Sequence, residues 1–550
     1  MNPHQNKLIE LAKKCLYLGK YEYLNLIIDK LLQISSNDAD VLLEIGKLYG
    51  GMKNYNYAYE FINKSFELEK SVETLQALAN TNYLRGDFAS SAIQYEELTK
   101  HIEKEEIYIQ CRKSYENYGL DEEAIRIAKE EVDKFGTADS FSELIFLYIT
   151  VGMEEEAIKY CEELKKKYPN HAITFNSLGF LYECIYNDYE TAKKYFLKAA
   201  KMGFINAYYN LGVCCKQSED LENAEKYLKR LITLDTKSET DYNYTLGSVY
   251  FAQRKMALGY KYYKNRSIAR DLNIRNKNKY WDGKEYPNEI LYVQHEQGFG
   301  DNIQFIRYLP MVAKKFKKVI YGTTSNLIEL FKRSFPQEKF PNIEIVENNE
   351  VVRYNKFVLI MDIPNLLHQN FHNIPFQKSY LVADKRKQEM MKINYFNSDK
   401  VKIGLNWRAK GMALRDAVYR TIDAPYYFKP LFDIPNTEFY SFQMNDIFGM
   451  CEKYPQIIDL SKEIDTFDET AALLKNIDIL ITVDTALAHL AGALGVKTYL
   501  LLCHAPDWRW FENTEKTEWY PSITIIRQQD RRTWEDVSKK LYEYIKSDLT

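Results

Sequence analysis

A motif that recurs about every 34 residues is the feature that most constrains the fold of this chain. It reads NSLGFLY at 176–182, YNLGVCC at 209–215 and YTLGSVY at 244–250. Each copy leads through a short turn to a helical stretch, such as AKKYFLKAA or AEKYLKRLI, and weaker copies stand earlier in the chain. A repeat of this length predicts a pair of helices that cannot bury its own apolar face, so neighbouring pairs must stack.

The repeats resemble the tetratricopeptide repeat, which has small residues where its helices touch and aromatic residues where they interlock. We count seven or eight units between about residues 7 and 272 and expect an all-α tetratricopeptide-repeat solenoid over residues 1–272. Stacked pairs curl into a groove that can receive a protein or peptide. The alternative is that the array only braces the rest of the chain.

Composition excludes several classes of protein. Hydrophobic residues make up 46% and charged residues 27% of the 550, which is typical of a globular chain and not of a disordered one. Lys and Arg (74) nearly balance Asp and Glu (77), so the charge gives no reason to expect nucleic acid as a partner. Eight cysteines without C-x-x-C spacing, no apolar signal-like run and no transmembrane segment predict a soluble protein of the reducing cytoplasm.

The pattern changes after residue 272. A polar linker is expected over 273–288, and short β-rich runs then alternate with helical patterns, which predicts parallel sheets covered by helices. We expect two Rossmann-like lobes, an N-terminal lobe at 289–390 and a C-terminal lobe at 391–550. Ligands of such folds bind at the carboxyl ends of the strands, so the two lobes should face each other across a ligand site.

A glycine turn opens the first lobe. The strand ILYVQ leads to Gly298, Gly300 and Asp301, and then to an amphipathic stretch. Glycines let the backbone approach a ligand, and the following helix offers free N–H groups to anions. Ile303 stands where a dinucleotide fingerprint needs its third glycine. Asp301 is either a helix N-cap or a general base, and Glu296 is a second candidate base.

A second turn lies within DILITVDTALAHLAGALGVKTYLLL at 478–502. A buried strand ends at Asp484 and Thr485, and a helix of small residues follows. Thr485 and the neighbouring N–H groups suit a pyrophosphate, and Asp484 suits the hydroxyls of a sugar or ribose. The alternative is that these residues cap the helix and that His489 packs against the next strand.

Three segments together carry a family resemblance: EQGFGDNIQFIRYLP at 296–310, VDTALAHLAGALG at 483–495, and APDWRW at 505–510 with WYP at 519–521. They resemble the C-terminal module of bacterial tetratricopeptide-repeat glycosyltransferases, which are related to the heptosyltransferases of glycosyltransferase family 9. The resemblance implies a GT-B fold and transfer of a sugar from a nucleotide donor with inversion, without a metal or other cofactor. It makes Asp301 the general base.

The resemblance also implies a donor site in the C-terminal lobe and an acceptor site in the N-terminal lobe. Asp484, Thr485 and His489 match the family segment that binds the phosphates and sugar of the donor, and we place Gly298 and Gly300 beside it. A basic residue of this family pairs with the pyrophosphate. This chain lacks the usual Gly-Asn-Pro after Trp407, so Arg408, Lys410 and Arg420 all remain candidates, and Trp508 is a candidate for stacking on a base or sugar.

The sequence therefore predicts an inverting, metal-independent glycosyltransferase that moves a sugar to a protein or glycan acceptor recruited by the repeat array. Heptose is the sugar that the relatives imply, but neither the sugar nor the base of the donor is fixed by the sequence. Flagellin, an autotransporter, a glycan and a lipid-linked acceptor are all open. Two alternatives remain: an adaptor with a degenerate, inactive transferase-like domain, and another two-lobed nucleotide-binding enzyme such as an epimerase.

Overall fold

The structure is a computed structural model. It describes residues 1–236, 239–264, 266, 277–296, 298–348, 350, 352–375, 378–409, 420–422, 425–444, 446, 449–511, 514–530 and 533–549. These residues form two compact units, Met1–Tyr186 and Asn187–Thr550. Within the described ranges, no helix is both long enough and apolar enough to cross a bilayer.

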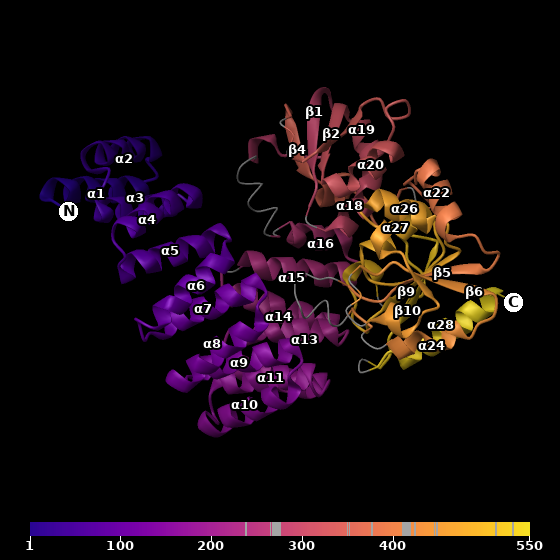
Figure 1. Ribbon diagram of the computed structural model, residues 1–550, viewed down its shortest axis with the longest axis horizontal. Coiled ribbons are helices and arrows are strands. Elements are labelled where there is room, and N and C mark those ends of the chain that lie inside the picture. The colour runs from indigo at the N-terminus through magenta and orange to yellow at the C-terminus, as the bar shows by residue number, and fades with distance from the viewer. Residues whose placement is uncertain are drawn as a thin grey trace. The chain divides into compact units, whose positions relative to one another are not determined.

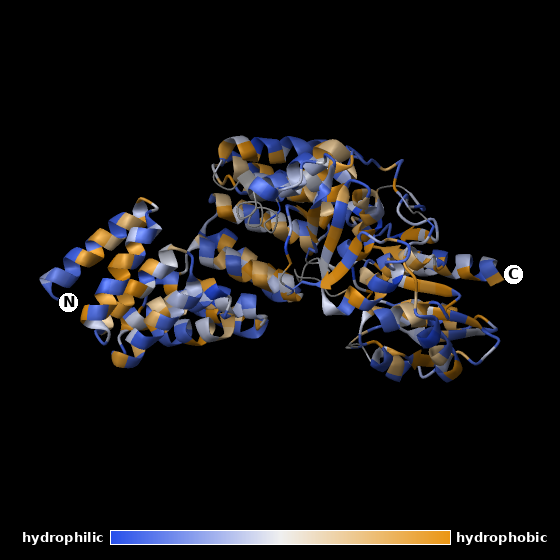
Figure 2. Ribbon diagram, turned by 90° about the horizontal axis from the view of Figure 1, so that it is seen from above, coloured by the Kyte–Doolittle hydropathy of each residue, from blue (hydrophilic) through white to orange (hydrophobic). Residues whose placement is uncertain are grey.

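The first unit is an array of antiparallel helices (Figure 1). The helices are α1 (Pro3–Tyr17), α2 (Tyr21–Ser35), α3 (Ala39–Gly51), α4 (Tyr55–Leu68), α5 (Val72–Arg85), α6 (Phe88–Thr99), α7 (Glu105–Tyr118), α8 (Asp121–Lys134), α9 (Ala138–Val151), α10 (Glu154–Lys167) and α11 (Ala172–Cys184). Figure 2 shows hydrophobic and hydrophilic stretches alternating along these helices, as expected where one face of each helix is buried.

The second unit begins with five more helices that repeat the same arrangement. They are α12 (Tyr189–Lys201), α13 (Ala207–Gln217), α14 (Leu221–Leu234), α15 (Glu239–Ala252) and α16 (Met256–Tyr263). Small residues stand where paired helices touch, because a Cβ on Gly212 of α13 would lie 2.8 Å from Leu228 Cγ of α14. Gly46 is placed in the same way against Ile62 in the first unit. The predicted helical array is confirmed.

The first sheet has four parallel strands in the order β3-β2-β1-β4. The strands are β1 (Tyr286–Gln294), β2 (Phe316–Thr323), β3 (Ile343–Glu347) and β4 (Lys356–Leu359). The helices around it are η1 (Lys277–Lys279), α18 (Phe299–Phe305), η2 (Ile306–Tyr308), α19 (Leu309–Ala313), α20 (Ser325–Ser334), η3 (Ile360–Asp362) and α21 (Ile363–Leu366). Leu291 pairs in register with Val319, and Val293 with Val358, and all four side chains are fully buried.

The second sheet has six parallel strands in the order β10-β9-β8-β5-β6-β7. They are β5 (Val401–Asn406), β6 (Thr437–Ser441), β7 (Ile457–Asp459), β8 (Ile479–Val483), β9 (Thr498–Leu502) and β10 (Ile523–Arg527). The helices are α22 (Lys385–Tyr395), η4 (Pro425–Phe428), α24 (Lys429–Phe432), α25 (Met450–Lys453), η5 (Ser461–Glu463), α26 (Phe467–Leu474), α27 (Ala486–Leu494), η6 (Trp508–Trp510) and α28 (Glu535–Leu549). Two parallel sheets follow the helical array, as predicted.

The last repeat and the two sheet regions share one hydrophobic core. It includes Phe251 of α15, Phe305 of α18 and Leu490 of α27, all fully buried. Polar contacts also join the two sheet regions. The buried guanidinium of Arg307 donates to the carbonyl of Trp519 at 3.0 Å, and Arg333 Nη2 of α20 donates to an Asp468 carboxylate oxygen of α26 at 3.0 Å. The helices that follow β1 and β8, which are α18 and α27, also pack against each other.

Two of the predicted segment boundaries fall inside regular elements of the structure. β1 begins at Tyr286, inside the predicted linker 273–288, and residues 273–276 of that linker lie outside the described residues. The predicted boundary between residues 390 and 391 falls inside α22, which packs against α26 beside the second sheet.

Candidate functional site

The turn from β1 to α18 places Asp301 in the first turn of a helix. Gly298 is the N-cap of α18, so Asp301 is not the capping residue that one interpretation of the sequence required. A Cβ on Gly298 would lie only 2.6 Å from Asp301 Oδ2. The carboxylate therefore folds back over the glycine, and the absence of a side chain at position 298 leaves room for it.

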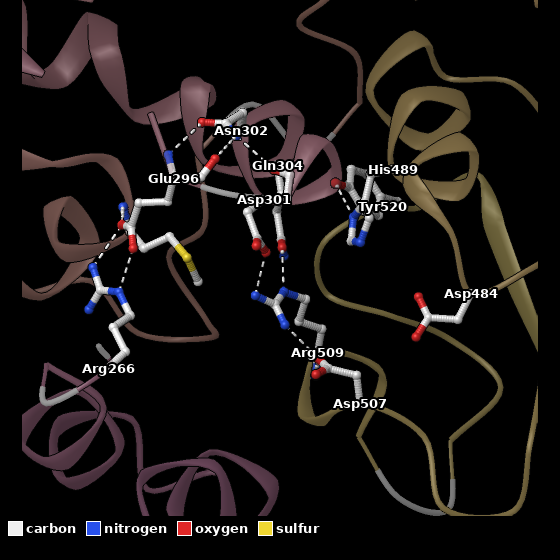
Figure 3. A network of polar contacts seen from close by, with 12 residues as sticks. Arg266, Glu296, Asp301, Asn302, Gln304, Asp484, His489, Asp507, Arg509 and Tyr520 are labelled. Atoms are coloured by element: carbon white, nitrogen blue, oxygen red, sulfur yellow. Dashed lines mark hydrogen bonds and ion pairs between the residues drawn. The ribbon is translucent and has the colours of Figure 1, made fainter. Parts of the chain in front are cut away.

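Arg509 holds this carboxylate from the other sheet region (Figure 3). Its Nη2 donates to Asp301 Oδ1 at 2.5 Å and its Nη1 to Asp507 Oδ1 at 2.7 Å. The Nε atom donates to Gln304 Oε1 at 3.0 Å, and the side chain of Arg509 is only 10% exposed. A planar guanidinium in a fixed set of bonds is well suited to orient a carboxylate.

The two carboxyls that flank Arg509 differ in their electrostatics. Desolvation raises the pKa of Asp301 above its usual value, although the positive charge of Arg509 acts in the opposite direction. Desolvation acts on Asp507 in the same sense, but the charge and hydrogen bonds of Arg509 outweigh it and lower the pKa of that carboxyl. Asp301 is therefore the carboxylate that takes up a proton more readily, as a general base must.

The turn from β8 to α27 carries the second predicted set of residues. Thr485 is the N-cap of α27, but its side chain makes no capping bond to the first amides of that helix. Its Oγ1 instead accepts a hydrogen bond from Asn406 Nδ2 at 3.3 Å, at the end of β5. The side chain of Thr485 thus leaves the first N–H groups of α27 uncapped, and uncapped N–H groups at the beginning of a helix can bind anions.

Asp484 is buried beside Arg420. The Nη1 atom of Arg420 lies 3.7 Å from Asp484 Oδ2, and only 6% of Asp484 is exposed. Desolvation raises the pKa of Asp484, while the charge of Arg420 opposes the rise. Of the three predicted basic residues, Arg420 is thus placed at this turn. Arg408 follows β5, where its backbone N–H donates to Gln443 Oε1 at 2.9 Å, and Lys410 lies outside the described residues.

His489 lies in α27 as a buried, neutral side chain. Its Nδ1 lies 3.0 Å from the hydroxyl of Tyr520, and its ring stacks on Trp510 with centroids 5.1 Å apart. Burial lowers its pKa to about 3, and the positive charge of Arg509 acts in the same direction. His489 therefore acts at neutral pH through hydrogen bonds and not through charge.

The two turns meet at Gly300. A Cβ there would lie 2.7 Å from His489 Cδ2 and 3.6 Å from Ala486 Cα. The first turn of α18, with Asp301, therefore faces the first turn of α27, and these two helices pack together. The structure thus brings Gly298, Gly300 and Asp301 to the segment that holds Asp484, Thr485 and His489. Figure 3 shows Asp301, Asp484 and His489 in one region.

Two predicted residues serve packing and ion pairing. The indole of Trp508 stacks on Phe251 of α15, with ring centroids 4.2 Å apart and an interplanar angle of 23°, and is 4% exposed. Glu296, the second candidate base, is buried and accepts two bonds from Arg266, at 2.5 and 2.7 Å. It also accepts a bond from the backbone N–H of Met361. Glu296 is thus tied to a structural ion pair.

Arg509 and Asp507 were not predicted as site residues. Both belong to the segment APDWRW, where only the aromatic side chains were candidates. The available signal was a lone arginine between two tryptophans, since a charge in an apolar motif needs a partner when buried. Its main partner, Asp301, is 208 residues away in sequence.

Comparisons with known proteins identify the helical array. Residues 205–238, which contain α13 and α14, match the tetratricopeptide repeat family, so the array contains repeats of this kind. The chain is also similar to Protein FlbA of Caulobacter vibrioides, with 22% identity over 420 residues. The similar region covers 70% of this chain and 68% of that protein.

Two solved structures are similar at 16% identity. One is YrrB, described as a TPR protein with an unusual peptide-binding site (32% of this chain, 92% of that chain, TM-score 0.26). The other is the C-terminal part of a TPR repeat-containing protein from Cytophaga hutchinsonii (42% of this chain, 98% of that chain, TM-score 0.31).

Proposed function

We propose that the chain is an inverting, metal-independent glycosyltransferase that moves a sugar from a nucleotide-sugar donor to a protein or glycan acceptor. One observation carries the proposal: the turn with Asp301 and the turn with Asp484 and Thr485 come from two different parallel sheets and face each other. The two turns come into contact where Gly300 approaches His489. Transfer between two substrates needs a base and a phosphate-binding turn that face each other across a short distance.

The donor fits the turn after β8. A nucleotide sugar carries a diphosphate, and the beginning of α27 offers N–H groups and the positive end of a helix dipole. Arg420, which lies 3.7 Å from Asp484, adds a guanidinium that can pair with phosphate oxygens. These groups would stabilise the charge that develops on the departing nucleoside diphosphate. Thr485 would contact the diphosphate together with these N–H groups, and Asp484 would bond hydroxyls of the sugar or ribose.

The acceptor hydroxyl fits the turn after β1. Asp301 removes the proton of that hydroxyl, and the oxygen attacks the anomeric carbon of the donor from the face opposite the diphosphate. The bond from the anomeric carbon to the diphosphate oxygen breaks, and its electron pair leaves with the nucleoside diphosphate. One displacement of this kind inverts the anomeric configuration. The raised pKa of Asp301 favours proton uptake, and its partner Arg509 keeps the carboxylate oriented.

Replacement of Asp301 by Asn tests the proposal. The full chain and Asp301→Asn would be assayed with ADP-, UDP-, GDP- and CDP-sugars, in EDTA and in Mg²⁺. We expect the wild-type chain to release nucleoside diphosphate in both buffers, and the variant to bind the same donor while turnover falls at least about 100-fold. Unchanged turnover in the variant would exclude Asp301 as the base. Activity that EDTA abolishes would exclude the metal-independent mechanism.

A second candidate function is an adaptor whose transferase-like domain is inactive. The observation in its favour is that Asp301 Oδ1 is already bonded to Arg509, and a carboxylate held by a guanidinium is a weaker base. Calorimetry separates the two functions. An adaptor would bind none of the four nucleotide sugars, whereas a transferase would bind one of them in preference to the others.

A further inference from the structure

A continuous stack of side chains joins the last repeat to the candidate base. Phe251 of α15 is fully buried and lies face to face with Trp508, with ring centroids 4.2 Å apart. The guanidinium carbon of Arg509 lies 4.5 Å from the centre of the Trp508 ring. Arg509 in turn donates to Asp301 at 2.5 Å. Three successive contacts therefore lead from a repeat helix to the candidate base.

Phe251 is fixed from several sides. Its ring meets Tyr260 and Tyr263 of α16 edge to face, with centroids 4.9 and 5.3 Å apart. A Cβ on Gly259 would lie 2.4 Å from Phe251 Cδ1, so this glycine leaves the space that the ring fills. A ring held in this way has one position available, and Trp508 must pack where that position allows.

A second contact anchors the same segment at its far end. Arg254, just beyond α15, donates from Nη1 to Glu518 Oε1 at 2.6 Å. Its guanidinium carbon also lies 4.3 Å from the centre of the Phe511 ring. The last repeat thus contacts η6 through Phe251 and the residues after η6 through Arg254, on either side of Arg509.

We propose that α15 positions the candidate base: Phe251 supports Trp508, Trp508 supports Arg509, and Arg509 holds Asp301. Phe251 is then a positioning residue, because it touches neither donor nor acceptor. The inference rests on the proposed function. It goes beyond that function because it makes the last repeat part of the transfer site and not only an arm that recruits the acceptor.

The test uses the full chain with two changes in the last repeat and one control. Phe251→Ala removes the ring, and Phe251→Leu retains much of the apolar volume without the flat face. Gly259→Ala keeps Phe251 but displaces it. The control is Leu258→Ala, because Leu258 is the neighbour of Gly259 in α16 and its side chain is exposed.

Two measurements report on Asp301. The first is the pH profile of kcat, whose acidic limb follows protonation of the base. The second needs no activity: water-soluble carbodiimide with glycine ethyl ester amidates carboxyl groups, and mass spectrometry gives the rate at Asp301. A carboxylate paired with Arg509 reacts slowly, because the pair keeps it ionised and partly covered.

We expect Phe251→Ala and Gly259→Ala to shift the acidic limb upward by roughly half a unit to one unit and to speed amidation of Asp301 several-fold. Phe251→Leu should give a smaller change, and Leu258→Ala none. An unchanged acidic limb and an unchanged amidation rate in both Phe251→Ala and Gly259→Ala would overturn the proposal. If both variants also melted at a lower temperature, Phe251 would support only the fold and not the position of Asp301.

The same measurements separate this proposal from the proposed function. If the wild-type chain transfers no sugar, the transferase function fails, and the amidation rates still decide whether Phe251 governs Asp301. If Phe251→Ala does not fold, Gly259→Ala decides, because alanine within α16 is itself compatible with a helix. Arg509→Gln is the positive control, in which the pair is absent and amidation should be fastest.

Discussion

Gly300 lies so close to His489 that a Cβ on the glycine would stand 2.7 Å from His489 Cδ2. The two residues belong to the first turns of α18 and α27, which follow strands of different sheets. Only glycine fits at position 300, because the ring of His489 is held in place by Tyr520 and Trp510. This contact therefore sets the separation between Asp301 and the beginning of α27.

Gly300→Ala should separate the two turns. A methyl group against a fixed ring costs about 1 to 3 kcal/mol of folding free energy, and a shift of about 1 Å at a reacting centre can lower turnover about 100-fold. Melting temperature and kcat measure the two effects. Gly50→Ala in α3 is the control, since a Cβ there meets no atom within 4 Å, and it should leave kcat unchanged. Full turnover in Gly300→Ala would contradict the predicted geometry.

Glu296→Gln should lower mainly the stability of the chain, whereas Asp301→Asn should lower mainly its activity. Glu296 is 3% exposed and pairs with the buried Arg266, so loss of its charge should cost about 3 kcal/mol of unfolding free energy. Asp301 is more exposed, and Arg509 keeps its bond to Asp507 in the variant, so the replacement should cost only about 1 kcal/mol while turnover is lost. Urea denaturation with parallel assays measures both. A stable Glu296→Gln variant without activity would make Glu296 the better candidate for the base.

Local patterns predicted the repeats, the two parallel sheets and the positions of both turns. Each of these features lies within a few tens of residues, as with the period of about 34 or the strand before Asp484. The contacts of the candidate site are not local. Arg509 bonds to Asp301, which lies 208 residues earlier in the chain. Trp508, beside the second sheet, packs on Phe251 of the helical array. No periodicity carries such pairings, so candidate residues for the site could be predicted from the sequence but the bonds between them could not.

Arg307 is expected to stabilise the contact between the two sheet regions. Its buried guanidinium donates to the carbonyls of Gln304 and Trp519 and to the hydroxyl of Tyr380, at 2.9 to 3.0 Å. Arg307→Met keeps most of the volume but leaves these acceptors without a donor, so the free energy of unfolding should fall by about 1 to 3 kcal/mol. Arg353→Met, at an exposed position, should have no effect in the same urea titration.

His489 should make stability depend on pH in a defined window. Its pKa is lowered by burial from 6.5 to about 3 in the folded chain. Between these values the unfolded chain binds a proton that the folded chain does not, so stability falls as pH falls from 6.5 toward 3. The full slope of this one group is about 1.4 kcal/mol per pH unit.

His489→Gln removes that titration, so its stability should change less steeply than that of the wild-type chain between pH 6.5 and the acid limit of the folded state. Urea denaturation at a series of pH values gives both slopes. Above the unfolded pKa the two chains should differ by a constant amount, which reflects the lost contacts with Tyr520 and Trp510. Parallel slopes over the whole range would mean that His489 binds its proton equally in both states and that its neutral form is not enforced by the fold.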